Sequence, residues 1–219
     1  MKKAIVVGDL HGKFEIVERA LEYKDHKIIF VGDYLDDFTR TRAEQITTAQ
    51  LVINAMKEEP NRIYALKGNH ELSYEDPIMR CSGYSEKTHG KVMQNLDLSE
   101  LYDYLWVGDY LISHAGVSNK LLEADNISLE RYLEVGNFNQ IGYSRGGNSP
   151  YGGLFWCDWW EEFEPVDDTP QIVGHSQYRP WGEPEGIVTK GNSYNIDCLG
   201  RVSEVLVLEK DKEPRVMII

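Results

Sequence analysis

The chain has 219 residues, 42% of them hydrophobic, which is enough for one globular domain with a sizeable core. Its 36 acidic residues against 23 basic ones give a net charge of −13, which argues against nonspecific binding to nucleic acid, because such binding depends on Lys and Arg contacts to phosphate. The chain has no apolar segment long enough for a membrane span. The three cysteines form no CxxC pair and we see no secretory signal, so we expect a cytoplasmic protein with reduced thiols.

The first half of the chain alternates short apolar runs with helical patterns. An apolar run at 4–7 precedes helical spacing over 14–24, a run at 28–31 precedes helical spacing over 43–59, and a third run lies in RIYALKG. Two later runs lie in YLISHAG and PQIVGHS. This alternation predicts an α/β fold with a mainly parallel sheet, in which the carboxyl ends of the strands line one crevice.

Each of these runs ends in a glycine or a polar residue, and the polar residues that follow should share one rim. They are Asp9, His11, Asp33, Asn69, His70, His114 and His175. Two aspartates, three histidines and one asparagine exceed what one cation needs, and they suit two cations that share a carboxylate. His70, directly after Asn69, could then donate a proton to a leaving oxygen.

The rest of the chain has less regular patterns. We expect a single domain, 1–219, with a helical or loop-like cap inserted around 74–109. Helices are predicted to begin near Asp97 and after the capping residue Ser128, and the Gly-rich segment 142–153 predicts a mobile loop near the site. Four C-terminal strands, two of them around the turn at 190–193, predict antiparallel pairing and a second sheet packed on the first.

Five motifs in this order, GDLHG, GDYLDD, GNHE, SHAG and VGHS, resemble the calcineurin-like metallophosphoesterase superfamily. The resemblance implies a four-layer α/β/β/α sandwich of two mixed sheets. Position by position, it implies that Asp9 and His11 bind one metal, Asp33 bridges both, and the second metal is bound by Asn69, His114 and His175. His70 would be the general acid, oriented by Asp36.

Two details concern the branch of this superfamily. Gln177 stands where a GH-x-H motif would have a second histidine. Serine/threonine protein phosphatases and symmetric diadenosine tetraphosphate hydrolases also lack this histidine. Asp37-Phe38 stands where that branch has Arg-Gly, with the arginine on the substrate phosphate. The candidates to replace this arginine are Arg40, Arg42, Arg145 and Arg179.

The first hypothesis is a two-metal phosphatase that hydrolyses phosphomonoesters by attack of metal-bound hydroxide, with phosphoserine and phosphothreonine in proteins as substrates. The alternative is a phosphohydrolase of nucleotides or dinucleoside polyphosphates, and a further alternative is a phosphoryl-binding module with little turnover. A nuclease is disfavoured by the missing histidine and the acidic charge. The donors suit manganese best, with iron or zinc as alternatives. The sequence leaves the oligomeric state open.

Overall fold

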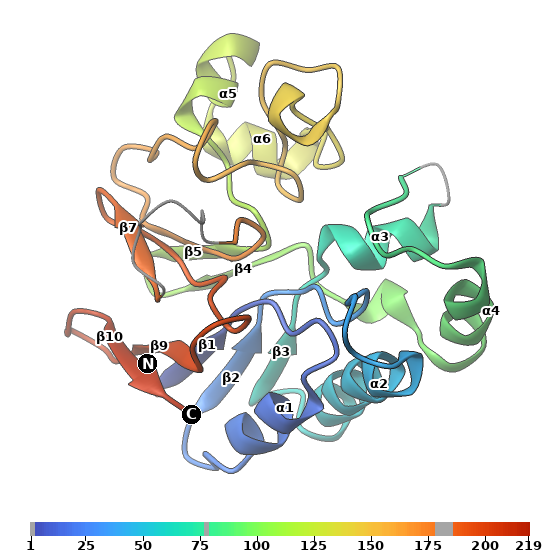
Figure 1. The fold of residues 1–219 in the computed structure, drawn as a ribbon. Helices are drawn as coiled ribbons and strands as arrows, with labels where there is room; N and C mark the ends of the chain where they lie inside the picture. The colour runs from blue at the N-terminus through green and yellow to red at the C-terminus, as the bar shows by residue number, and fades with distance from the viewer. Residues whose placement is uncertain (1–2, 77–78, 178–185) are drawn as a thin grey trace.

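Two five-stranded mixed sheets form the centre of the molecule in the computed structural model, which describes residues 3–76, 79–177 and 186–219 (Figure 1). The first sheet has the order β10-β9-β1-β2-β3. Its strands β1, β2 and β3 are parallel to one another. Strand β9 pairs antiparallel with β1, and β10 pairs antiparallel with β9. Their bounds are β1 Ala4–Val7, β2 Lys27–Phe30, β3 Ile63–Ala65, β9 Glu204–Leu208 and β10 Arg215–Ile218.

The second sheet has the order β4-β5-β6-β8-β7. Strands β5, β6 and β8 run parallel, and the outer strands β4 and β7 pair antiparallel with β5 and β8. Their bounds are β4 Tyr104–Val107, β5 Tyr110–Ser113, β6 Gln171–Val173, β7 Val188–Lys190 and β8 Ser193–Asn195.

Helices cover the outer face of each sheet, so the molecule has four layers (Figure 1). Along β1, Ile5 and Val7 pack toward the helices, whereas Ala4 and Val6 pack between the two sheets. The predicted α/β/β/α sandwich is confirmed. The helices are α1 Phe14–Leu21, α2 Arg42–Glu58, α3 Asn69–Glu75, α4 Glu86–Asn95, α5 Asn119–Asp125 and α6 Leu129–Val135, with short 3₁₀ turns η1 Leu98–Glu100 and η2 Tyr143–Arg145.

The prediction of a helix from Asp97 is wrong. Only the 3₁₀ turn η1 forms there, and the chain then enters β4 at Tyr104. A hairpin turn at Gly108, whose φ is +63°, brings β4 back onto β5. Cross-strand pairing in the second sheet therefore overrides the helical spacing of this segment. The capping residue Ser128 is confirmed, since its side chain accepts the N–H of Arg131 at the start of α6.

The prediction that the C-terminal strands form the second sheet is correct only for β7 and β8. Strands β9 and β10 extend the first sheet beside β1. The apolar residues of β9 point alternately to both faces, with Val207 toward the helices and Leu206 between the sheets. Such a strand needs cover on both sides, and its position beside β1 provides that cover.

The remaining segments bear on the later sections. Within 74–109 the chain forms α4, η1 and β4, and the single domain with a cap-like insertion stays a prediction. Segment 142–153 is bound to Glu162, whose carboxylate accepts the N–H of Gly152 at 2.7 Å, and its mobility stays a prediction. Among helices in the described ranges, none is long and apolar enough to cross a membrane.

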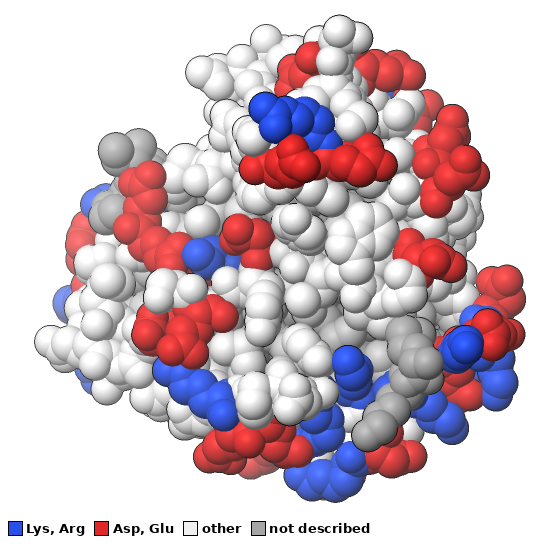
Figure 2. Space-filling model, turned by 180° about the vertical axis from the view of Figure 1, so that it is seen from behind, with Lys and Arg blue, Asp and Glu red and all other residues white. Residues whose placement is uncertain are grey.

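The charged side chains seen from behind are mixed. Among the described residues on this face, basic side chains lie next to acidic ones rather than in one continuous stripe (Figure 2). The expectation that the chain does not bind nucleic acid stays a prediction, as does its cytoplasmic location.

Candidate metal centre and active site

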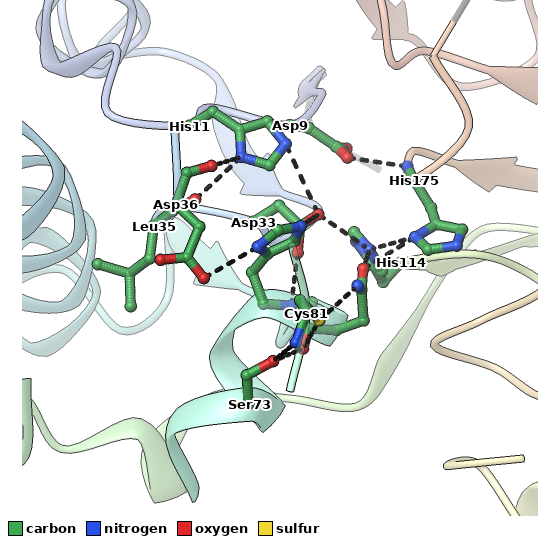
Figure 3. Close-up of polar contacts among 12 residues, drawn as sticks. Asp9, His11, Asp33, Leu35, Asp36, Ser73, Cys81, His114 and His175 are labelled. Atoms are coloured by element: carbon green, nitrogen blue, oxygen red, sulfur yellow. Dashed lines mark hydrogen bonds and ion pairs between the residues drawn. The ribbon is translucent and has the colours of Figure 1, made fainter. Parts of the chain in front are cut away.

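The polar residues predicted to share a rim do lie together, at the edge where both sheets end (Figure 3). The sequence analysis expected these residues at the edge of a single sheet. Both sheets contribute to the rim instead, because β5 and β6 belong to the second sheet. The first sheet delivers its residues after β1, β2 and β3, and the second delivers His114 after β5 and His175 after β6. The sheets are packed face to face, so their carboxyl ends meet.

One group of donors surrounds the amide of Asn69. Asn69 Oδ1 lies 2.8 Å from His114 Nε2 and 2.8 Å from His175 Nδ1, and these two ring nitrogens are 3.2 Å apart. Asp33 Oδ2 lies 3.4 Å from His114 Nε2. Donors of these types at such distances could hold one divalent cation.

Asp33 also faces a second group. Its Oδ2 lies 3.8 Å from His11 Nε2 and 3.8 Å from His70 Nε2, and these three residues form a further cluster that could hold a cation. The Asp33 carboxylate therefore lies between the two groups, where a carboxylate shared by two cations must lie.

Two of the histidines present an unprotonated nitrogen to this space. His11 Nδ1 donates to the backbone oxygens of Leu35 and Asp36, both at 2.9 Å, and His114 Nδ1 donates to Val31 O at 3.0 Å. Burial lowers the pKa of His11 and of His114 to about 3. The neutral rings leave each Nε2 lone pair directed at Asp33, as a metal ligand requires.

Asp9 is held by the loop after β6. Its Oδ2 accepts the backbone N–H of His175 at 2.9 Å, whereas its buried Oδ1 has no hydrogen-bond partner in the described part of the chain. Burial raises the pKa of both Asp9 and Asp33. A buried carboxylate oxygen without a partner is costly. The unpaired oxygen and the neutral imidazoles therefore fit divalent cations bound at this rim.

The motif glycines leave room for these carboxylates. A Cβ on Gly68 would lie 2.1 Å from Asp33 Oδ1, and a Cβ on Gly174 would lie 2.0 Å from Asp9 Oδ1. Backbone strain marks the same loops, because His11, Asp33, Asp36 and His175 all have φ between +42° and +67°. Non-glycine residues adopt this left-handed region at a cost, and such residues cluster at functional sites.

Glu71 fixes the strained loop after β2. Its buried carboxylate accepts the backbone N–H groups of Asp33 and Tyr34 at 2.8 Å and that of Gly68 at 3.0 Å. Glu71 thus joins the loop that carries Asp33 to the start of α3, which carries Asn69.

A chain of side chains supports His70. Its Nδ1 lies 3.0 Å from Asp36 Oδ2, as the predicted orientation of His70 by Asp36 requires. The hydroxyl of Tyr74, on the same helix, donates to the other oxygen of Asp36. The sequence contains no motif that singles out Tyr74. Its place one turn after His70 on α3 brings it to Asp36.

A cavity of about 720 Å³ opens over these residues. Arg145 lines it; its guanidinium contacts Ser176 Oγ at 2.9 Å and Asp158 Oδ2 at 3.0 Å, and its buried Nε has no hydrogen-bond partner among the described residues.

Arg40 and Arg42 do not line the cavity, and the choice of the phosphate-binding arginine stays a prediction. Arg40 pairs with Glu15 and Glu44 at the start of α2, and Arg42 Nε donates to Thr88 Oγ1 at 3.0 Å. Arg179 lies outside the described residues.

Asp37 lies at the mouth of the cavity, where the resemblance had implied an arginine. Its Oδ1 accepts the backbone N–H groups of Thr39 and Arg40, both at 2.6 Å, so the carboxylate is bound to its own loop.

The sequence analysis did not single out Tyr74, Arg80, Asp158 or Asp197, which line the cavity or support its residues. Only Asp197 had a signal, since it follows the apolar strand in YNIDCLG as Asp9 and Asp33 follow theirs. The three cysteines are free, and Cys157 and Cys198 are also buried. Cys81 is instead half-buried at the site, where it accepts a hydrogen bond from Asn69 Nδ2 at 3.0 Å.

The fold and the rim define an α/β protein with a candidate two-cation centre. The model of the calcineurin-like phosphoesterase family matches residues 2–205, and the chain therefore belongs to this family of metal-dependent phosphoester hydrolases.

Two curated relatives are similar in sequence. A protein phosphatase 2A catalytic subunit of Dictyostelium discoideum is 30% identical over 142 residues, which cover 60% of this chain and 44% of the relative. A PP2A-like serine/threonine-protein phosphatase of Saccharomyces cerevisiae is 28% identical over 191 residues, which cover 81% of this chain and 48% of the relative. The chain thus spans about half the length of these relatives.

Solved structures share the fold. A serine/threonine phosphatase from Saccharomyces cerevisiae with similarity to human phosphatase PP5 superposes with a TM-score of 0.62 at 16% identity, covering 99% of this chain and 79% of that one. A cold-active protein tyrosine phosphatase also has a TM-score of 0.62, at 15% identity, covering 96% and 75%. Since both kinds of phosphatase match equally well, the fold does not distinguish their substrates.

Proposed function

We propose that the chain is a two-metal phosphatase that hydrolyses phosphomonoesters, with phosphoserine and phosphothreonine in proteins as its substrates. The observation that carries the proposal is the position of Asp33 Oδ2, between Nε2 of His11 at 3.8 Å and Nε2 of His114 at 3.4 Å. The relatives named as PP2A-type phosphatases support the substrate class.

Six residues would hold the cations. Asp9, His11 and Asp33 would hold one, and Asp33 would share the other with Asn69, His114 and His175. Bound there, two divalent cations would supply Lewis-acid activation of the phosphoryl group and a water-derived nucleophile at neutral pH. Manganese suits this mixture of carboxylate, amide and imidazole donors, with iron and zinc as the other choices.

His70 and Arg145 both line the cavity and would act on the substrate there. His70, held through Nδ1 by Asp36, would donate the proton of its Nε2 to the leaving oxygen of the ester. The Arg145 guanidinium would bind non-bridging phosphoryl oxygens, replacing the arginine that Asp37 displaces in the sequence.

The test is turnover of p-nitrophenyl phosphate and a phosphoserine peptide with Mn²⁺ and after chelation. We expect turnover only with metal. His70→Asn should lower kcat on the peptide by about 10²–10⁴-fold, whereas the control His26→Asn should not, because His26 bonds to Asp25 and packs on Tyr23 outside the cavity. Absence of metal-dependent turnover on both substrates would refute the proposal. Retained phosphate binding in that case would support the binding-module alternative.

A second candidate, hydrolysis of nucleotides or dinucleoside polyphosphates, is favoured by the aromatic wall of the cavity. Phe38, which is 85% exposed, lines the cavity with the half-buried Trp160 and the buried Trp156. Exposed aromatic rings can stack on a nucleobase. Rates on diadenosine tetraphosphate and on the phosphopeptide, measured side by side, separate the two candidates: a higher kcat/KM on the dinucleotide would favour the second.

A further inference from the structure

A sixth strand also ends at the rim. Strand β8 runs parallel to β6, and the residues after it are bound to the loop that carries His175: Ile196 N–H donates to Val173 O at 2.8 Å, and Asn195 Nδ2 donates to Ser176 O at 2.7 Å. Asp197 comes next in the chain and lines the same cavity as His11 and Asp33. Its position therefore matches that of the other carboxylates that follow strands.

The Asp197 carboxylate is buried, and one of its oxygens is unpaired within the described ranges. The residue is 6% exposed, and its buried Oδ2 has no hydrogen-bond partner among the residues that the structure describes. The ion pairs within the described ranges do not include it. Lys13, the basic group that acts most strongly on it, bonds instead to Leu10 O at 3.1 Å. A buried carboxylate in this state is costly unless a cation compensates it.

Asp197 lies on the Asp9 side of the rim. A Cβ on Gly8 would lie 2.2 Å from Ile196 O and 3.6 Å from Asp197 Cα, so the backbones on either side are in close contact. Asp9 Oδ1 is unpaired as well. Two buried carboxylates with unpaired oxygens beside the same loop repel each other, and a cation between them removes that repulsion.

The cation position next to Asp9 is also the one with fewer donors. Asp33, Asn69, His114 and His175 would surround one position, whereas Asp9, His11 and Asp33 would serve the other if His70, which lies in the same cluster, is kept as the proton donor. Gln177, at the place of the missing second histidine, is exposed, and its backbone oxygen accepts from Trp160 Nε1. A fourth donor is therefore needed from elsewhere.

We propose that Asp197 supplies a carboxylate oxygen to the cation held by Asp9, His11 and Asp33. The inference rests on the proposed two-metal function. It makes this position harder, with three carboxylates and one imidazole, than the position of Asn69, His114 and His175. The two positions then differ in metal preference, with the harder one favouring Mn²⁺ and the imidazole-rich one accepting Zn²⁺.

The test measures binding of Mn²⁺ to the metal-free full chain by calorimetry, with bound metal counted by elemental analysis. In Asp197→Asn we expect one of two Mn²⁺ ions to bind at least 10-fold more weakly, with the other unchanged. The control is Asp37→Asn, which removes one negative charge from the same cavity but keeps the oxygen that accepts from its own loop. It should bind both ions like the wild type.

The outcomes separate the two proposals. If the wild type binds no Mn²⁺, the two-metal function itself fails. If the wild type binds two ions and Asp197→Asn binds both with equal affinity, only the role of Asp197 is overturned. An equal loss in Asp37→Asn also overturns it, because the effect is then one of net charge. Thermal unfolding in chelator checks that Asp197→Asn is folded, and Asp197→Glu, which keeps the carboxylate, should retain tighter binding than Asp197→Asn.

Discussion

Glu71→Gln tests whether one buried carboxylate holds the loop that carries Asp33. Both oxygens of Glu71 are used: Oε2 accepts from Asp33 and Gly68, and Oε1 accepts from Tyr34 and, at 3.4 Å, from Leu35. Glutamine keeps only one acceptor oxygen, so its amide group must face a backbone N–H. A buried N–H and a buried amide donor then lack partners, at about 1–3 kcal/mol each.

We therefore expect Glu71→Gln to lower the free energy of unfolding by roughly 3 kcal/mol, which for a chain of this size lowers Tm by roughly 6–12 °C. Thermal and urea unfolding in chelator measure it, since bound metal would add its own stabilisation. The control Glu75→Gln lies on the same helix but is exposed and pairs with Lys67, so it should cost less than about 1 kcal/mol. A Tm for Glu71→Gln within about 2 °C of the wild type would refute the reasoning.

Three further predictions concern the site. Burial lowers the pKa of His114 to about 3, so below about pH 6.5 the unfolded chain binds more protons than the folded chain, and the free energy of unfolding falls as the pH is lowered. Between about pH 6.5 and about pH 5 the metal-free wild type should lose roughly 1.5 kcal/mol more than His114→Asn, and parallel pH profiles would contradict this. Arg145→Ala should weaken inhibition by inorganic phosphate by about 10-fold or more, whereas Arg42→Ala should change it by less than about 2-fold; equal effects would exclude the role of Arg145. Tyr74→Phe should lower kcat about 5-fold on an alkyl phosphate but little on p-nitrophenyl phosphate, whose leaving group needs no proton; an equal loss on both would argue against an effect through Asp36 and His70.

Much of the candidate site could be predicted from the sequence because local patterns encode it. Short apolar strands that end in Gly-Asp or Gly-His put their polar residues at strand ends, and strand ends in an α/β fold meet at one edge. His11, Asp33 and His114 lie together as this argument expects. The arginines could not be ranked in this way, because their local sequences do not say which partners the guanidinium groups of Arg40 and Arg145 contact in the folded chain.

Local sequence was enough to predict the α/β layers, the strand-end donors and the family to which the chain belongs, because each depends on residues close together in the chain. The packing of the whole chain was needed to set which sheet each strand joins, to make the segment after Asp97 a strand, β4, and to bring Tyr74 to the site. Pairing between distant strands and the burial of a carboxylate depend on what the rest of the chain packs against them, and no local pattern carries that information.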